Sequence, residues 1–178
     1  MVVGRQALFP APSRQVRFNA AIAGQVAGAA MVLCLVAAYR FLLGTDWGFP
    51  LRLFAALVLG AEAFERPDLR TLLVGFLVHQ LGPVVLWARL FGLVLGFRKA
   101  PPTMVLSLAV GFVVAFVALA IDVHLLLPPV LSMMHGANIW AENVPRAVAW
   151  VAHLVYGGVL GAAYGMLARM PVGVPNPD

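Results

Sequence analysis

The sequence predicts an all-α integral membrane protein: a single transmembrane domain over residues 1–178, folded as an antiparallel four-helix bundle. Three observations predict this fold. Hydrophobic residues make up 62% of the chain, and charged residues only 11%. Mean hydropathy is +0.94, and four apolar runs approach the roughly 20 residues that a helix needs to cross a bilayer. Because a soluble domain carries about 25% charged residues, we expect lipid to surround most of this chain.

The four apolar runs define the expected spans. The second run continues past Arg89, because a long arginine side chain can reach the membrane surface while its stem stays in lipid. Pro128 and Pro129 are expected to end the third span, since proline lacks the amide donor of a continuing helix. The predicted spans cover about residues 20–43, 70–97, 101–122 and 146–168.

A shorter apolar stretch at residues 51–65 is bordered by charges. At about 1.5 Å per residue, its apolar core is too short to cross the membrane. Leu53, Phe54 and Leu57 recur at helical spacing, which favours an interfacial helix. A second interfacial segment is expected at residues 130–140, with Trp140 as an anchor. Both segments would lie in the outer connections.

Charges at the ends of the spans predict the orientation. Arg5, Arg14 and Arg17 precede the first span, and the turn between the second and third spans carries Arg89, Arg98 and Lys99. The connection from Asp46 to Arg70 mixes arginines with acids. Cytoplasmic loops are enriched in Lys and Arg, so both termini are expected in the cytoplasm. The high content of Ala, Gly, Val and Arg indicates a GC-rich bacterial genome, which makes the bacterial inner membrane the expected location.

Small residues recur every four positions in the first and last spans. Such faces let helix backbones approach closely in lipid, so they predict tight packing within the bundle or onto another subunit. The other interpretation is a face that makes room for a flat cofactor. The glycines concerned are Gly24, Gly28, Gly157, Gly161 and Gly165.

Beyond the lipid bilayer, the expected partners are other membrane subunits or further copies of the chain. The formal net charge is +5, but the basic residues lie mostly at the ends of apolar runs. No basic stripe is interleaved with aromatic residues, so nucleic acid is not an expected partner.

The last span carries a resemblance to a known group of proteins. The stretch His153-Leu-Val-Tyr-Gly-Gly-Val-Leu-Gly-Ala-Ala-Tyr-Gly165 resembles the last helix of small bacterial four-helix inner-membrane proteins of unknown function. Some of those proteins carry a sodium:proline symporter label. The resemblance implies a four-helix membrane protein and defines no chemistry.

Histidines are the main candidates for a site. Under the predicted topology, His79 and His153 lie in the outer halves of the second and fourth spans. An ionisable residue inside the membrane is costly and commonly marks a site. If these two imidazoles face each other, they could be the axial ligands of a b-type haem. A quinol or proton site is a second interpretation, and a purely structural hydrogen bond between helices is a third.

A second candidate cluster lies at the outer end of the third span. Thioether and imidazole ligands suit copper, and this region combines both types. The candidate ligands are His124, Met133, Met134 and His135. The alternative interpretation is ordinary packing, since methionine in an apolar segment usually fills space.

No catalytic signature occurs in the sequence: there is no phosphate-binding glycine loop, GxSxG, HExxH or CxxC. An enzyme is therefore not the expected class. The leading expectation is a non-catalytic accessory or scaffolding subunit of a membrane complex. Two alternatives stay open: a redox protein that binds haem b or quinol through His79 and His153, and a small oligomeric transporter or channel. The transporter is disfavoured because no acidic residue is expected inside a span.

Overall fold

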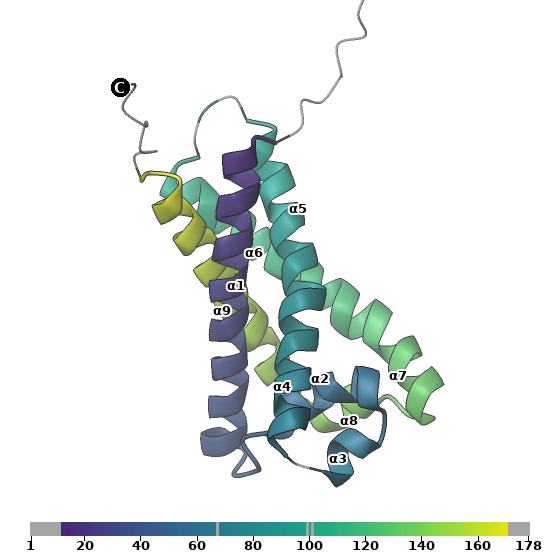
Figure 1. Cartoon of the computed structure of the whole chain (residues 1–178). Coiled ribbons are helices and arrows are strands. Elements are labelled where there is room, and N and C mark those ends of the chain that lie inside the picture. Colours follow the sequence, from purple (N-terminus) through teal and green to yellow (C-terminus); the bar gives the residue numbers. More distant parts are fainter. Residues whose placement is uncertain (1–11, 67, 99, 101, 171–178) are drawn as a thin grey trace, which may run out of the picture.

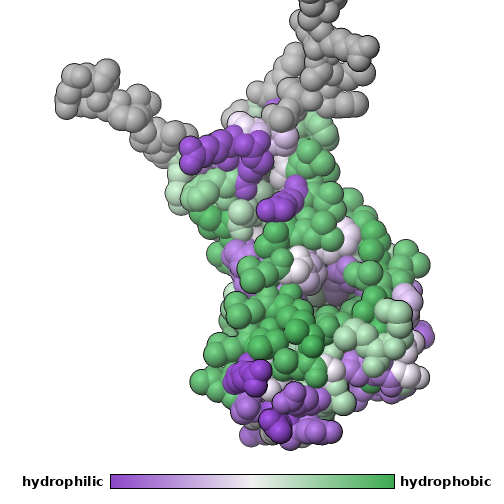
Figure 2. Space-filling view, turned by 45° about the vertical axis from the view of Figure 1, so that its right-hand side comes forward, coloured by the Kyte–Doolittle hydropathy of each residue, from purple (hydrophilic) through white to green (hydrophobic). Residues whose placement is uncertain are grey.

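The computed structural model describes residues 12–66, 68–98, 100 and 102–170, and all regular structure within them is helical. Four helical segments are long and apolar enough to cross a membrane. The all-α, four-helix membrane arrangement is thereby confirmed (Figure 1). Figure 2 shows hydrophilic residues gathered toward the two ends of the molecule, with a largely hydrophobic region between them. The four segments are Arg14–Leu42, Leu69–Gly96, Met104–His135 and Arg146–Leu167.

The first span consists of α1 (Arg14–Ala37) and a π-helical turn, η1 (Ala38–Leu42). Its first residue lies before the charge-free run, because Ser13 caps the helix. The Ser13 hydroxyl accepts a hydrogen bond of 3.2 Å from the Val16 amide, which satisfies one of the donors that every helix start leaves open.

The second span consists of α4 (Leu69–His79), η2 (Gln80–Val84) and α5 (Val85–Gly96). Pro83 lies inside η2. A π-helical turn is wider than an α-helical one, and this widening lets the helix continue through a residue that has no amide hydrogen.

The third span differs from the expectation. It consists of α6 (Met104–Ala118), η3 (Leu119–Leu126) and α7 (Leu127–His135), so the prediction that Pro128 and Pro129 end it is wrong. The two prolines lie where η3 passes into α7, and the wider π-helical turns before them let the helix continue through residues that have no amide hydrogen. The helix ends instead at Gly136, whose φ of 73° is left-handed. Asp122 and His124 therefore lie inside the span.

The fourth span is α9 (Arg146–Leu167). It packs along both α1 and α6, and α1 packs along α5. The start of α1 and the end of α9 lie at the same end of the bundle (Figure 1). We call this the arginine end. Its described charged residues are Arg14, Arg17, Arg89, Arg98 and Arg169.

The opposite end, here the connection end, holds three short helices: α2 (Phe49–Leu59), α3 (Glu62–Glu65) and α8 (Ile139–Asn143). Protein covers much of the apolar face of α2, since Leu53 and Phe54 are buried. The helix packs against α4, where the Leu51 carbonyl occupies the space that a Cβ on Gly75 would need.

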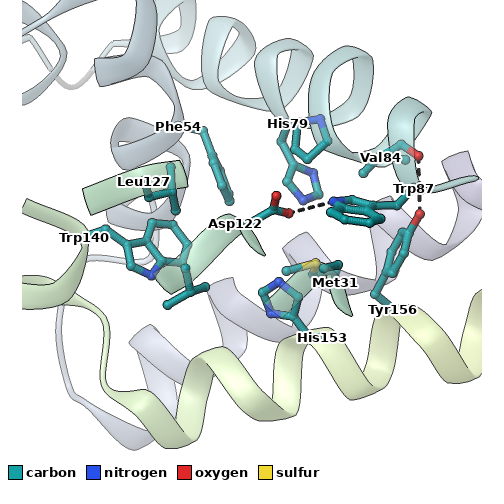
Figure 3. A pocket seen from close by; sticks show the side chains of 13 residues that line it. Met31, Phe54, His79, Val84, Trp87, Asp122, Leu127, Trp140, His153 and Tyr156 are labelled. Carbon is teal, nitrogen blue, oxygen red and sulfur yellow. Dashed lines mark hydrogen bonds between the residues drawn. The ribbon is translucent and has the colours of Figure 1, made fainter. Parts of the chain in front are cut away.

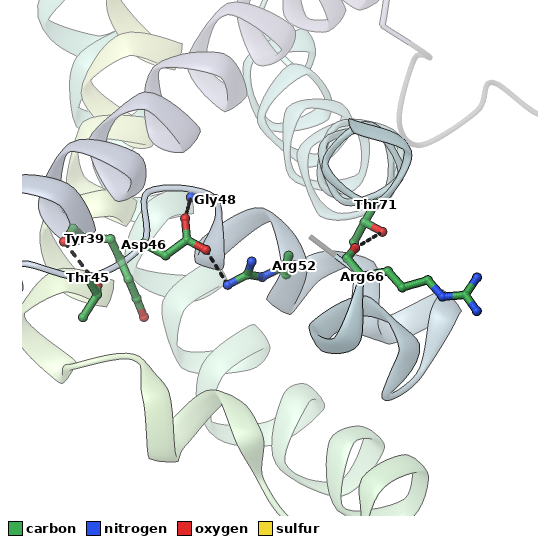
Figure 4. Close-up of polar contacts among 7 residues, drawn as sticks. All are labelled: Tyr39, Thr45, Asp46, Gly48, Arg52, Arg66 and Thr71. Carbon is green, nitrogen blue, oxygen red and sulfur yellow. Dashed lines mark hydrogen bonds and ion pairs between the residues drawn. The ribbon is translucent and has the colours of Figure 1, made fainter. Parts of the chain in front are cut away.

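Polar contacts fix the segment that leads from η1 into α2 (Figure 4). Asp46 accepts a hydrogen bond of 2.9 Å from the Gly48 amide and forms an ion pair of 2.6 Å with Arg52. The Thr45 hydroxyl donates to the Tyr39 carbonyl at 3.2 Å. These bonds hold α2 beneath the bundle, where it contributes Phe54 to the cavity described next.

Candidate functional site

The glycines of α9 lie against α6. A Cβ on Gly157 would come within 2.5 Å of the Gly111 carbonyl oxygen, and one on Gly161 within 2.5 Å of the Ser107 carbonyl oxygen. A Cβ on Gly165 would lie 2.7 Å from the sulfur of Met104. The absence of side chains at these positions therefore lets the two backbones touch, as small residues do in membrane helix pairs.

The glycines of α1 face the second span in the same way. A Cβ on Gly24 would collide with that of Ala88, and a Cβ on Gly28 would collide with the side chains of Gln80 and Val84. These glycines contact other helices of the same chain. We call the α6–α9 and α1–α5/η2 contacts the glycine seams.

A cavity lies beyond the seams, on the side of the connection end, where all four spans and α2 meet. Its volume is about 40 Å³, which is room for a few water molecules, because one needs about 10–15 Å³ on this measure. Figure 2 shows a hollow near the middle of one face, with hydrophilic residues inside it. The cavity is lined by Met31, Phe54, His79, Pro83, Val84, Trp87, Ala118, Asp122, Val123, Leu127, Trp140, His153 and Tyr156.

Asp122 is the acidic residue of this cavity. It enters from η3, and Trp87 Nε1 donates a hydrogen bond of 2.7 Å to its Oδ2 (Figure 3). Within the described residues, no lysine or arginine forms an ion pair with it. The expectation that no acid lies inside a span is therefore wrong. In the sequence analysis Asp122 was the last residue of the third span. The sequence is nevertheless mostly apolar on both sides of it, and on the C-terminal side the apolar residues extend to Leu127.

His79 lies on the cavity wall, with 2% of its surface exposed. Its ring centroid is 4.6 Å from that of Phe54, and its Nδ1 has no hydrogen-bond partner among the described residues. Trp140 Nε1, on the same cavity, is also buried and bonds to none of the residues that the structure describes. Buried polar groups are normally bonded to protein or to ordered water, so these two nitrogens are available to bond water in a cavity of this size.

His153 reaches the cavity from α9. Its Nδ1 lies 2.8 Å from the Ala149 carbonyl oxygen. Because a carbonyl can only accept, Nδ1 carries the hydrogen, and in the neutral imidazole Nε2 is then an acceptor. One turn along, the Tyr156 hydroxyl donates to the Val84 carbonyl at 3.3 Å. Figure 3 shows His79 and His153 reaching the cavity from different helices.

The cavity in its present form is too small for a haem. Small-molecule sites typically have volumes of about 300–1,000 Å³, against about 40 Å³ here. Haem ligation by His79 and His153 would require the helices to separate, and it stays a prediction. Within the described part of the chain, no three His, Cys, Asp or Glu residues form a group that could hold a metal ion.

The proposed copper ligands lie in and after η3. His124 is exposed, and Met133 and Met134 have exposed fractions of 82% and 43%. His135 Nε2 lies 3.2 Å from the Ala56 carbonyl oxygen, a contact that ties the end of α7 to α2. Copper binding by these residues stays a prediction.

The chain matches no protein-family model, no curated protein and no solved structure. The resemblance of the last span to small bacterial inner-membrane proteins therefore stays a prediction. What the fold itself establishes is a multi-pass membrane protein with an acid, two imidazoles and two indoles around a small cavity between its helices.

Proposed function

We propose that this multi-pass protein is a small transporter that binds a proton at Asp122. The observation that carries the proposal is the position of this carboxyl group, within a membrane-spanning helix and without a cationic partner among the described residues. Acidic residues at such positions mark ion pathways and proton relays. A transporter was disfavoured because no acid was expected inside a span. Asp122 is such an acid, so this objection no longer holds.

The surrounding groups fit proton exchange. Trp87 holds one oxygen of Asp122, which leaves the other oxygen to take up the proton. In the neutral ring His153 Nε2 is an acceptor, and His79 Nδ1 bonds to no described residue. A few water molecules in the cavity could connect these groups. In this arrangement the carboxylate takes a proton from water and later returns it, with the imidazoles as intermediate carriers.

Two distorted helices border the cavity. Residues of η2 and η3 line it, and π-helical turns are frequent at functional sites. Transporters commonly place their ion sites where membrane helices are interrupted. Four helices enclose little water, so the proposed transporter is a homo-oligomer.

The proposed location is the bacterial inner membrane, with both termini in the cytoplasm. The described residues of the arginine end include no acidic residue, whereas the connection end mixes arginines with acids. The excess of positive charge on cytoplasmic segments supports this orientation, and the cavity then lies toward the outer surface.

The accessory role has weaker support. It was expected to depend on packing through the glycine faces and the apolar surface, and those glycines contact helices of the same chain. A redox role with haem would need a much larger cavity than the one present.

Infrared spectroscopy of the full chain in lipid vesicles tests the proposal. We expect a pH-dependent carboxylic acid band that disappears in Asp122→Asn, together with pH-gradient-driven proton movement that is lost in the same variant. Glu142→Gln is the matched control, because Glu142 is an exposed acid in α8, and both signals should persist in it. Proton movement that survives in Asp122→Asn would contradict the proposal, as would a band that is unchanged.

A further inference from the structure

A groove runs between α1 and α5 at the arginine end. Its volume is about 620 Å³. The two helices are in close contact at its base, where a Cβ on Gly92 would lie 2.7 Å from that of Ala20. The groove is lined by Pro12, Arg14, Arg17, Phe18, Ala20, Ala21, Leu86, Arg89, Leu90, Gly92 and Leu93.

Three exposed arginines lie on this groove. The Arg17 Nη1 donates a hydrogen bond of 2.6 Å to the Pro12 carbonyl, which holds its guanidinium beside the start of α1. Neither Arg14 nor Arg89 forms an ion pair with a described residue. The described acids all lie in the cavity or at the connection end, so no described carboxylate is near enough to neutralise this group.

Arg89 is the most deeply placed of the three. It lies seven positions before the end of α5 at Gly96, which corresponds to about 10 Å along a helix axis. A cation at that depth in a membrane is costly unless its long side chain reaches the membrane surface or an anionic partner. Its neighbours Leu86, Leu90 and Leu93 are exposed, so the surface next to the charge is suited to hydrocarbon.

We propose that this groove binds an anionic phospholipid. The phosphodiester would pair with Arg14, Arg17 and Arg89, since guanidinium groups bind phosphate oxygens with directed, charge-assisted hydrogen bonds. One acyl chain would lie along the apolar wall of Phe18, Ala21, Leu86, Leu90 and Leu93. Basic pockets between membrane helices on the cytoplasmic side bind such headgroups. The site is separate from the cavity and does not depend on proton transport.

Native mass spectrometry of the full chain in mild detergent, with added lipid, tests this site. We expect phosphatidylglycerol to be retained in preference to phosphatidylcholine, and this preference to weaken at high salt. A charge near an anionic lipid surface contributes about five-fold in affinity. Arg17→Gln/Arg89→Gln should therefore weaken phosphatidylglycerol binding by about 25-fold and leave phosphatidylcholine binding unchanged.

The matched control is Arg40→Gln/Arg146→Gln, which removes two exposed arginines at the connection end and should keep the preference. Arg17→Lys/Arg89→Lys should restore most of it. Helical circular dichroism and gel filtration confirm that each variant is folded. Equal binding of the two lipids by the unmodified chain would overturn the proposal. An equal loss in the control pair, or displacement of the lipid by inorganic phosphate, would also overturn it.

Discussion

The same helices are in close contact at the glycine seams and are held apart around the cavity. At the seams, glycine lets α9 touch α6 and α1 touch α5, with backbone and small side chains in contact. Around the cavity, the same spans contribute an acid, imidazoles and large rings, and the helices are π-helical at η2 and η3. The seams are closed because glycine has no side chain, and the cavity is kept open by large side chains.

This difference separates stability from function within one small bundle. Helices in lipid gain most from close packing, since lipid is as apolar as their side chains. The seams therefore carry much of the packing that keeps the bundle together. The cavity contains buried nitrogens that have no partner in the described part of the chain, which costs stability and is tolerated at functional sites. Substitutions in the two regions should therefore have different consequences.

The largest effect on stability is expected at Gly161. A Cβ there would lie 2.5 Å from the Ser107 carbonyl oxygen and 2.7 Å from the Leu108 Cα, and backbone atoms cannot move aside as side-chain ends do. We expect Gly161→Ala to lower the free energy of unfolding by about 3 kcal/mol, the upper end of the range for overpacking. Reversible unfolding in mixed detergent micelles measures this change.

Gly158→Ala is the matched control on the same helix. A Cβ at Gly158 would lie 3.5 Å from the Phe112 ring, an ordinary contact, so we expect a change below about 0.5 kcal/mol. An equal loss of unfolding free energy in the two variants would contradict the claim that close backbone contact at the α6–α9 seam stabilises the bundle.

A smaller effect on stability, with a larger effect on function, is expected at Trp87. Trp87→Phe keeps an aromatic ring and removes the donor that holds Asp122 at 2.7 Å. We expect a loss of about 1 kcal/mol, in the range of hydrogen bonds between membrane helices. The carboxyl band of Asp122 in the infrared spectrum should shift, because its hydrogen bond is lost.

Trp150→Phe provides the comparison for Trp87→Phe. Trp150 is 44% exposed and packs edge-on against Phe116, away from the cavity lining. Its replacement should change neither the carboxyl band nor proton movement. An unshifted band in Trp87→Phe would mean that the indole does not control the environment of the carboxyl group.

The seams were more accessible to sequence reasoning than the cavity. Gly24, Gly28, Gly157, Gly161 and Gly165 repeat at a helical period, so their faces can be read locally. What the period could not decide was the partner, because contact with a helix of the same chain and contact with another subunit need the same small residues.

The cavity depends on contacts between residues that are distant in sequence. The predicted site at His79 and His153 depended on the two imidazoles facing each other, a condition that the sequence could not test, and both residues line the cavity. Asp122 was taken as the end of the third span, whereas the helix continues beyond it to His135. Its partner Trp87 is 35 positions away, so the neighbouring sequence carries no sign of the bond. Pro128 likewise indicated a helix end. The π-helical turns of η3, through which the helix continues to Pro128, have no clear sequence signal.

The smallest effect is expected at the connection end, where an exposed side chain caps the start of a helix. Asp68 caps α4 by accepting a hydrogen bond of 2.8 Å from the Thr71 amide. This backbone bond, with additional contributions from the Thr71 side chain and nearby arginines, lowers the pKa of Asp68 below its usual value. Because the folded-state pKa is the lower one, the stabilisation is present above the unfolded-state pKa and is lost as pH falls through the folded-state pKa.

Asp68→Asn separates the cap from its charge. Asparagine also caps helices well but does not titrate, so the variant should stay folded at neutral pH and lose part of the acid dependence of unfolding. Unfolding measured at neutral pH and at about pH 3, below the usual carboxyl pKa, tests this expectation. The difference between the two pH values should be smaller in Asp68→Asn than in the unmodified chain, and an equal difference would contradict it. Gly161→Ala should leave that difference unchanged, because the α6–α9 seam contains no titrating group, and this contrast separates packing at the seams from solvated contacts at the connection end.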